Sequence, residues 1–430
     1  MTRSRRAAFA AILIVGAVVA LVVHGQLWRA GTAQVSEARA AELPTGKDSI
    51  ALAKVALDSC SKISGDKIPC YEQHLIPLVD VGGPKLAMGT LMQVANADRD
   101  VRGFGHVYAH AIGMHAFEAD KNVERTFSSC TDAFQSGCYH GVIEAYFASS
   151  GKVDSQSVRK LCVPWSQAGV YGWLRFQCAH GLGHGLTMHY EHDLVQSLKG
   201  CDLLVDSWDR ESCYGGAFME NVVDATEPHH GMPGMDMPEE KRSFKQIDKG
   251  DLNYPCSILP ERYLTTCYQN QVSIIMYFDD HKMPAVAKHC TQVPEKYRYM
   301  CFTGFGTDIN SFVVGDHLKA IDLCANAPEK YREWCIIGVV KNIIDVSAKT
   351  ADGVSFCQKV TEHHLKSRCY EAVGEESVSL EQRPEVRETF CAVSEPEYIE
   401  ACRFGARLIT EPPPGLGGGV SSEGAQGSSN

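Results

Sequence analysis

The pattern of apolar and polar positions divides the chain into an apolar N-terminal segment, a long mixed region and a polar tail. A basic flank, residues 1–6, precedes the run Ala7–Val23, which contains no charged residue. Such a run fits a membrane-spanning helix near its lower length limit, or a signal peptide, whose apolar region is usually shorter. We expect an uncleaved, single-pass signal-anchor at 7–25 with its basic end in the cytoplasm. The linker 26–46 and all later residues then lie in the periplasm or outside the cell.

Eighteen cysteines in the mixed region, 47–410, recur with a regular period. From Cys267 to Cys402 every second cysteine follows the previous one after about 34 residues, a period typical of helical-hairpin repeats. The chain has no Cys-x-x-Cys motif, which excludes zinc ribbons, thioredoxin-type dithiols and covalent haem c. In an oxidising compartment, the even count predicts disulfides between cysteines paired in chain order. These pairs are Cys60–Cys70, Cys130–Cys138, Cys162–Cys178, Cys201–Cys213, Cys256–Cys267, Cys290–Cys301, Cys324–Cys335, Cys357–Cys369 and Cys391–Cys402.

Pro-Glu pairs predict where the second helix of several hairpins begins. Proline suits the first helical position and glutamate the first turn. We therefore expect helices to start at Pro260, Pro294, Pro328 and Pro396. The first cysteine of each pair should end the preceding helix, so that a disulfide joins the two helices of one hairpin. The predicted fold is an all-α, right-handed α-solenoid of about ten hairpins, each stapled by a disulfide.

The period and the hairpin pattern resemble those of tetratricopeptide and Sel1-type solenoids. The usual tetratricopeptide signature residues are missing, so the resemblance concerns architecture and implies no function. One unit has Met92 and Phe104 where its cysteines would be expected. Glycine follows the second cysteine by three residues in several units, for example at Gly141 and Gly338, which indicates that neighbouring helices approach closely there.

The composition of the mixed region is typical of folded proteins, and its charge argues against a nucleic-acid partner. With 44% hydrophobic and 22% charged residues, the chain is typical of globular proteins. Its formal net charge of −11, without a basic stripe after residue 30, argues against a nucleic-acid partner. The tail 411–430 is rich in proline, glycine and serine, and we expect it to be disordered.

Histidines recur on one helical face in three consecutive units. Counted from the second cysteine or its replacement, positions two and six carry histidine or glutamate, and a spacing of four places both on one face. Equivalent positions on successive repeats lie side by side. We therefore expect the repeats at about 84–222 to form a metal site. Its predicted ligands are His106, His110, His140, Glu144, His180 and His184.

The number and type of these ligands favour copper or iron. A lone His-x3-His pair is usually no metal site, but many imidazoles packed together without a metal would leave buried polar groups unpaired. Imidazole and carboxylate bind zinc, iron, copper and manganese, and six ligands exceed those of one tetrahedral zinc ion. They suit two ions, or one ion with open positions; zinc is a weaker alternative and non-covalent haem b a weaker one still. Glu144 is expected to be a ligand or a catalytic base.

Other histidines and methionines are secondary candidates for the site. Two of these histidines lie nine residues beyond the first histidine of their helix, on its opposite side, and suit a role outside the ligand set. Three methionines extend the histidine rows, and an insertion at about 224–250 holds two histidines and three methionines, which suits Cu(I) or an ordinary solvent loop. The secondary candidates are His115, His189, Met114, Met188, Met219, His229 and His230.

These observations lead to different classes of function. The first is a metal-dependent oxidoreductase or oxygenase that acts outside the cytoplasm. The alternatives are a non-catalytic metal-binding or sensing protein and a solenoid that binds a protein on its concave face. The C-terminal repeats, 251–410, lack the histidines and suit a scaffold or a surface for a protein partner. Motifs of the G-x-S-x-G, P-loop and H-E-x-x-H kinds are absent from the sequence.

Overall fold

The computed structural model describes residues 48–150, 153–166, 172–226, 243–313, 315–414 and 416. Over these residues all regular secondary structure is helical, which confirms the predicted class. The predicted anchor at 7–25, His229, His230 and residues 417–430 of the tail lie outside the described residues. No helix in the described part of the chain is long and apolar enough to cross a bilayer.

The helices pack in chain order as hairpins of a first helix, A, and a second helix, B, although α13 has no A helix among the described residues. The A helices are α2 (Ser49–Cys60), α4 (Pro77–Ala97), α7 (Val123–Ser129), α9 (Ser155–Leu161), α11 (Leu194–Cys201), α14 (Met283–Gln292), α16 (His317–Cys324), α18 (Thr350–Cys357) and α20 (Pro384–Cys391). The B helices are α3 (Ile68–Leu75), α6 (Gly105–Asp120), α8 (Gly137–Ser150), α10 (Gly172–His189), α12 (Ser207–Thr226), α13 (Leu264–Phe278), α15 (Arg298–Val313), α17 (Glu329–Ser347), α19 (His363–Leu380) and α21 (Ile399–Gly405).

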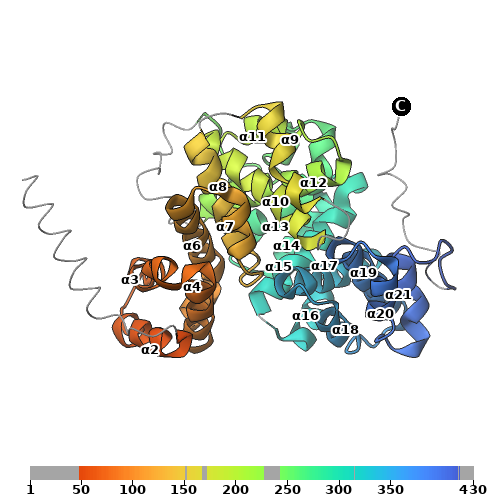
Figure 1. The fold of residues 1–430 in the computed structure, drawn as a ribbon. Helices are drawn as coiled ribbons and strands as arrows, with labels where there is room; N and C mark the ends of the chain where they lie inside the picture. The colour runs from red at the N-terminus through yellow and green to blue at the C-terminus, as the bar shows by residue number, and fades with distance from the viewer. Residues whose placement is uncertain are drawn as a thin grey trace, which may run out of the picture.

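Consecutive B helices form the interior of the molecule. From α6 to α21, each B helix packs directly against the next one. In Figure 1 the chain rises from α2 at the lower left to α11 at the top, and then descends to α21 at the lower right. The start of α10 also contacts the end of α19, where Gly172 lies beside Ser379 and Gln382. The later hairpins therefore fold back toward the middle of the array.

All nine predicted disulfides are present, and together they use every cysteine of the chain. Each joins residues 8 to 16 positions apart, with Cα atoms 5.5–5.8 Å from each other. The first cysteine ends its A helix in five hairpins, as at Cys60 and Cys324. Each short loop closed in this way contributes about 2–3 kcal/mol of stability in the chain-entropy model. So many disulfides suit an oxidising compartment.

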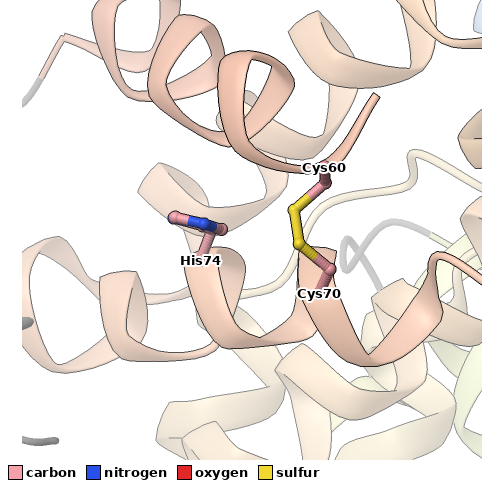
Figure 2. A group of neighbouring side chains, drawn as sticks. All are labelled: Cys60, Cys70 and His74. Carbon is pink, nitrogen blue, oxygen red and sulfur yellow. A yellow bond between two sulfur atoms is a disulfide. The ribbon is translucent and has the colours of Figure 1, made fainter. Parts of the chain in front are cut away.

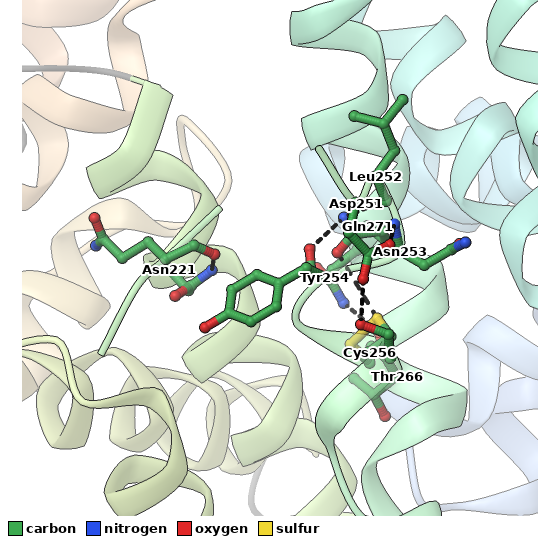
Figure 3. Close-up of a disulfide and its surroundings, with 12 residues drawn as sticks. Asn221, Asp251, Leu252, Asn253, Tyr254, Cys256, Thr266 and Gln271 are labelled. Carbon is green, nitrogen blue, oxygen red and sulfur yellow. Dashed lines mark hydrogen bonds between the residues drawn. A yellow bond between two sulfur atoms is a disulfide. The ribbon is translucent and has the colours of Figure 1, made fainter. Parts of the chain in front are cut away.

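Two details of the hairpins differ from the sequence-based prediction. Within the described residues the helix after the insertion has no A partner. Cys256 lies in a single 3₁₀ turn, and Gln271 of α13 donates to the carbonyl oxygens of Leu252 and Tyr254, each at 2.8 Å (Figure 3). The predicted starts at proline also shift slightly. Pro260, Pro294 and Pro328 occupy the N-cap positions just before the first turn, whereas Pro396 begins that turn.

Glycines let neighbouring B helices touch backbone to backbone, as their spacing predicted. A Cβ atom placed on Gly338 would lie 1.9 Å from the carbonyl oxygen of Thr303 on the preceding B helix. Near the histidines, Cβ atoms on Gly141 and Gly216 would lie 2.1 Å and 2.0 Å from the carbonyl oxygens of His110 and His180. These distances are far below any allowed contact, so only glycine permits this spacing of the helices.

We expect Gly338→Ala to lower the free energy of unfolding by about 1–3 kcal/mol or more, because the new methyl group must push α15 and α17 apart. Gly103→Ala, at the end of α5 (Arg99–Gly103), is the control, since a Cβ atom there meets nothing within 4 Å. Urea unfolding followed by circular dichroism measures both variants. A Gly338→Ala protein as stable as the control would contradict the tight helix contact.

Candidate metal centre

The six predicted ligands converge between three consecutive B helices, α6, α8 and α10. Ring centroids of histidines on adjacent helices are 4.7–5.5 Å apart. Ligand atoms lie within 4.8 Å of one another in three overlapping groups of three side chains. The first group is His106, His110 and His140; the second is His140, His180 and His184; the third is His110, Glu144 and His184. The structure therefore brings the six predicted side chains together in one cluster of overlapping groups.

The first pair of histidines lies on α6 and bonds outward through Nδ1. His106 Nδ1 is 2.8 Å from the carbonyl oxygen of Phe134, and His110 Nδ1 is 3.1 Å from a carboxylate oxygen of Glu144. A carbonyl or carboxylate oxygen only accepts, so each Nδ1 carries the proton and donates it. The two Nε2 atoms face each other at 3.0 Å.

The second pair, on α10, repeats this arrangement two units later. His184 Nδ1 is 2.8 Å from a carboxylate oxygen of Glu220 on α12, and both side chains are fully buried. The His180 ring is hydrogen-bonded to the backbone of Ser212, and its Nδ1 faces the same helix. The two Nε2 atoms lie 3.3 Å apart. Each pair thus has one histidine held by a carboxylate and one held by the backbone.

His140 on α8 stands between the two pairs. Its Nε2 donates to the side-chain oxygen of Gln177 at 2.9 Å. Its buried Nδ1 has no hydrogen-bond partner among the described residues. The ring stacks on His184 with centroids 4.7 Å apart and lies 5.4 Å from His110. His140 therefore presents a second nitrogen to the same pocket.

All five imidazoles share one bonding pattern: one ring nitrogen donates outward to an acceptor on the protein. In a neutral imidazole the other nitrogen then carries a lone pair. At 3.0 Å and 3.3 Å the facing Nε2 atoms would bring two lone pairs together without a hydrogen between them. Such a contact is repulsive unless a cation, either a proton or a metal ion, lies there.

Around His140 and His180 the surroundings disfavour a proton as that cation. Burial lowers the pKa of His140 and of His180 well below the usual histidine value, and the nearby imidazoles lower both further, His184 first. Neutral imidazoles are the form that binds metal ions. Outer hydrogen bonds to carboxylate, backbone or amide oxygens are also typical of metal-binding histidines, because they fix the tautomer and the ring orientation.

The spacing within each pair suits ligands that are adjacent on one ion. Two nitrogens bound to a tetrahedral ion at their usual bond length lie about 3.3 Å apart. The observed 3.0 Å and 3.3 Å need little adjustment. The axial ligands of a haem lie on opposite sides of the iron, roughly 4 Å apart, with the porphyrin between them. Neither pair leaves room for that arrangement.

Two residues of the centre were missed by sequence reasoning, namely Gln177 and Glu220. Gln177 directly precedes Cys178, so it lies before the first position of the repeat that was compared between units. Glu220 lies seven residues after Cys213, one position beyond the row that Met219 continues. It is four residues after Gly216, so it shares the helix face that touches α10. The spacing of four residues from Gly216, a position of close helix contact, was the sequence signal that could have identified Glu220.

None of the secondary candidates among the described residues belongs to the groups of close ligand atoms, and two of the candidates are not described. His115 Nε2 is 3.1 Å from a carboxylate oxygen of Asp80, and His189 packs edge-on to Phe147. Met114 packs against the hydrophobic core, and Met188 and Met219 are half-buried. His229 and His230 fall in the part of the chain that is not described, so their proposed role is untested.

A further cluster, Cys60, Cys70 and His74, also has ligand-type atoms close together (Figure 2). Its two sulfur atoms are bonded to each other as a disulfide. Disulfide sulfur is not the thiolate that binds metal ions, so this cluster is a structural crosslink beside a histidine. No protein-family model, curated protein or solved structure matches this chain.

We expect Glu220→Gln to weaken metal binding about 10–100-fold, because the amide keeps the shape but removes the charge that holds the His184 ring. Glu211→Gln is a matched control at an exposed position of the same helix. Competition between the protein and a chelating dye for Zn²⁺ measures both affinities. Equal affinities for the two variants would show that Glu220 does not support a metal ligand.

Proposed function

We propose that this protein is a membrane-anchored metalloprotein of the exoplasmic side with a histidine-rich copper or iron centre, and that it acts as an oxidoreductase or oxygenase. One observation carries the proposal: each of five imidazoles is held through one nitrogen and presents the other to a common pocket. Side chains arranged in this way bind a cation of the borderline-soft transition metals better than they bind a proton.

Copper and iron are favoured because the ligand set is dominated by neutral imidazole and lacks thiolate. Both metals accept histidine with a nearby carboxylate, and both change oxidation state, which supports redox chemistry. Glu144, within hydrogen-bond distance of His110 and 3.7 Å from His184 Nδ1, fixes the ring orientation and is the nearest base for a proton released in the pocket. A non-catalytic role in metal binding or sensing is the alternative.

The remaining parts of the chain are assigned as the frame for this centre. The basic flank and apolar run of residues 1–25 are proposed to anchor the protein with its helical domain outside the cytoplasm. The sequential packing of B helix on B helix supports a right-handed solenoid, in which the hairpins after residue 251 form a scaffold or a surface for a protein partner.

Metal analysis of the purified full-length chain tests the proposal. Copper or iron is expected in stoichiometric amount by mass spectrometry, with matching optical and electron-paramagnetic spectra. The metal should raise the melting temperature, since a ligand at 100 times its dissociation constant adds about 2.7 kcal/mol. His180→Ala/His184→Ala should lose this shift, whereas His363→Ala, an exposed histidine of α19, should keep it.

Oxygen consumption with candidate reductants separates the two roles. Turnover that disappears in His180→Ala/His184→Ala supports an oxidoreductase, while a loaded centre without turnover supports the binding or sensing role. A chain that takes up neither copper, iron nor zinc, and whose melting temperature ignores all three, would contradict the proposal as a whole.

A further inference from the structure

We propose that the centre holds two metal ions, one on the α6 pair and one on the α10 pair, with His140 between them. This inference rests on the proposed function, because it concerns the same side chains. It adds the number of ions, the ligands of each and the identity of the ion that meets substrate.

The ligand atoms of the five imidazoles are spread over more space than one ion can span. Within the described residues, the five imidazoles fall into two sets of three whose atoms lie within 4.8 Å of one another, and no single set contains all five. Two ligands of one ion are at most about twice a metal–nitrogen bond apart, roughly 4 Å. One ion therefore cannot reach all five nitrogens without moving a helix. His140 belongs to both sets, and since its Nε2 donates to Gln177, its single lone pair, on Nδ1, can serve one of the two ions.

The α6 pair and the α10 pair of histidines lie farther from each other than the two rings of one pair do. Within a pair, the ring centroids are 4.4 Å or 5.1 Å apart, and the Nε2 atoms are 3.0 Å or 3.3 Å apart, which suits two ligands on one ion. Between the pairs, the closest ring centroids are those of His110 and His184, at 5.4 Å, and the His106 and His184 centroids are 6.4 Å apart. Each pair thus offers two nitrogens to one ion without help from the other pair.

The outer carboxylates are duplicated in the same way. Glu144 accepts from His110 of the first pair, and Glu220 accepts from His184 of the second. Both carboxyl groups are buried, at 3% and 0% exposure. Each pair of histidines thus has its own buried carboxyl group, and Glu144 also lies 3.7 Å from His184 Nδ1, between the two pairs.

Exposure distinguishes the two ions. In the α10 pair His184 is fully buried and His180 is 9% exposed, so its ion is enclosed by protein. In the α6 pair His106 is only partly buried. An ion with three protein ligands and a solvent-facing side keeps a position for water or substrate. The α6 ion is therefore the one that binds substrate, and the α10 ion is the enclosed one.

Metal counting in the full-length chain tests this inference. The metal-free protein is loaded with Zn²⁺, passed through a desalting column and analysed for zinc per chain. Two equivalents are expected for the unmodified protein, and one each for His106→Ala/His110→Ala and His180→Ala/His184→Ala. A chelator should remove the two equivalents in two phases, and the faster phase should be missing in His106→Ala/His110→Ala.

A second measurement keeps the test independent of how the variants fold. With Cu²⁺, the unmodified protein should show magnetic coupling between two ions in its electron-paramagnetic spectrum. One equivalent in the unmodified protein, lost from either double variant, would overturn the two-ion arrangement and leave the proposed function standing. Release in one phase would overturn the assignment of the open ion. No uptake at all would overturn the proposed function itself.

Discussion

The backbone contact between consecutive B helices is the constraint on which the rest of the structure depends. Imidazole is a short side chain, and rings on helices at an ordinary spacing of 8–10 Å meet only at their tips. Gly141 and Gly216 remove the Cβ atoms that would hold α8 from α6 and α12 from α10. The helices then approach until a carbonyl oxygen fills the place of the missing side chain. That approach lets Glu144 of α8 reach His110 Nδ1 and Glu220 of α12 reach His184 Nδ1.

The same helix face serves different chemistry farther along the array. At position six, where α6 and α10 carry histidine, α17 carries Lys341 and α19 carries Glu375, and these two side chains form an ion pair at 2.8 Å. Opposite charges satisfy each other there and need no added ion. Imidazole rings cannot satisfy each other in this way once each has donated its proton to an outer acceptor. The repeat frame is common to both regions, and the side chains placed on it decide which region requires a cation.

Much of this arrangement was predictable because it is periodic. The cysteine spacing predicted the hairpins and all nine disulfides. The five histidines and Glu144, at positions two and six of three consecutive repeats, predicted which side chains would meet. Features that break the period were not predictable: in the described part of the hairpin after the insertion there is no A helix, and Cys256 lies in a 3₁₀ turn instead. Glu220 was missed for a related reason, since it lies one residue off the row. Sequence spacing gives the face of a helix, but only helix contact geometry shows which neighbour the face reaches.

The disulfides explain how a ligand cluster of this kind can exist before a metal arrives. Facing lone pairs and buried carboxylates oppose folding, and removing the cation would drive a loosely held site apart. Here two of the three helices that carry the rings, α8 and α10, are tied to their hairpin partners by Cys130–Cys138 and Cys162–Cys178. The third, α6, has no disulfide and is held by its close backbone contact with α8 at Gly113 and Gly141. Such crosslinks stabilise the fold without any contribution from the metal, whereas small metal-dependent domains unfold when the ion is lost. A frame stable on its own keeps the rings in place, so the energy of metal binding is available for affinity rather than for folding.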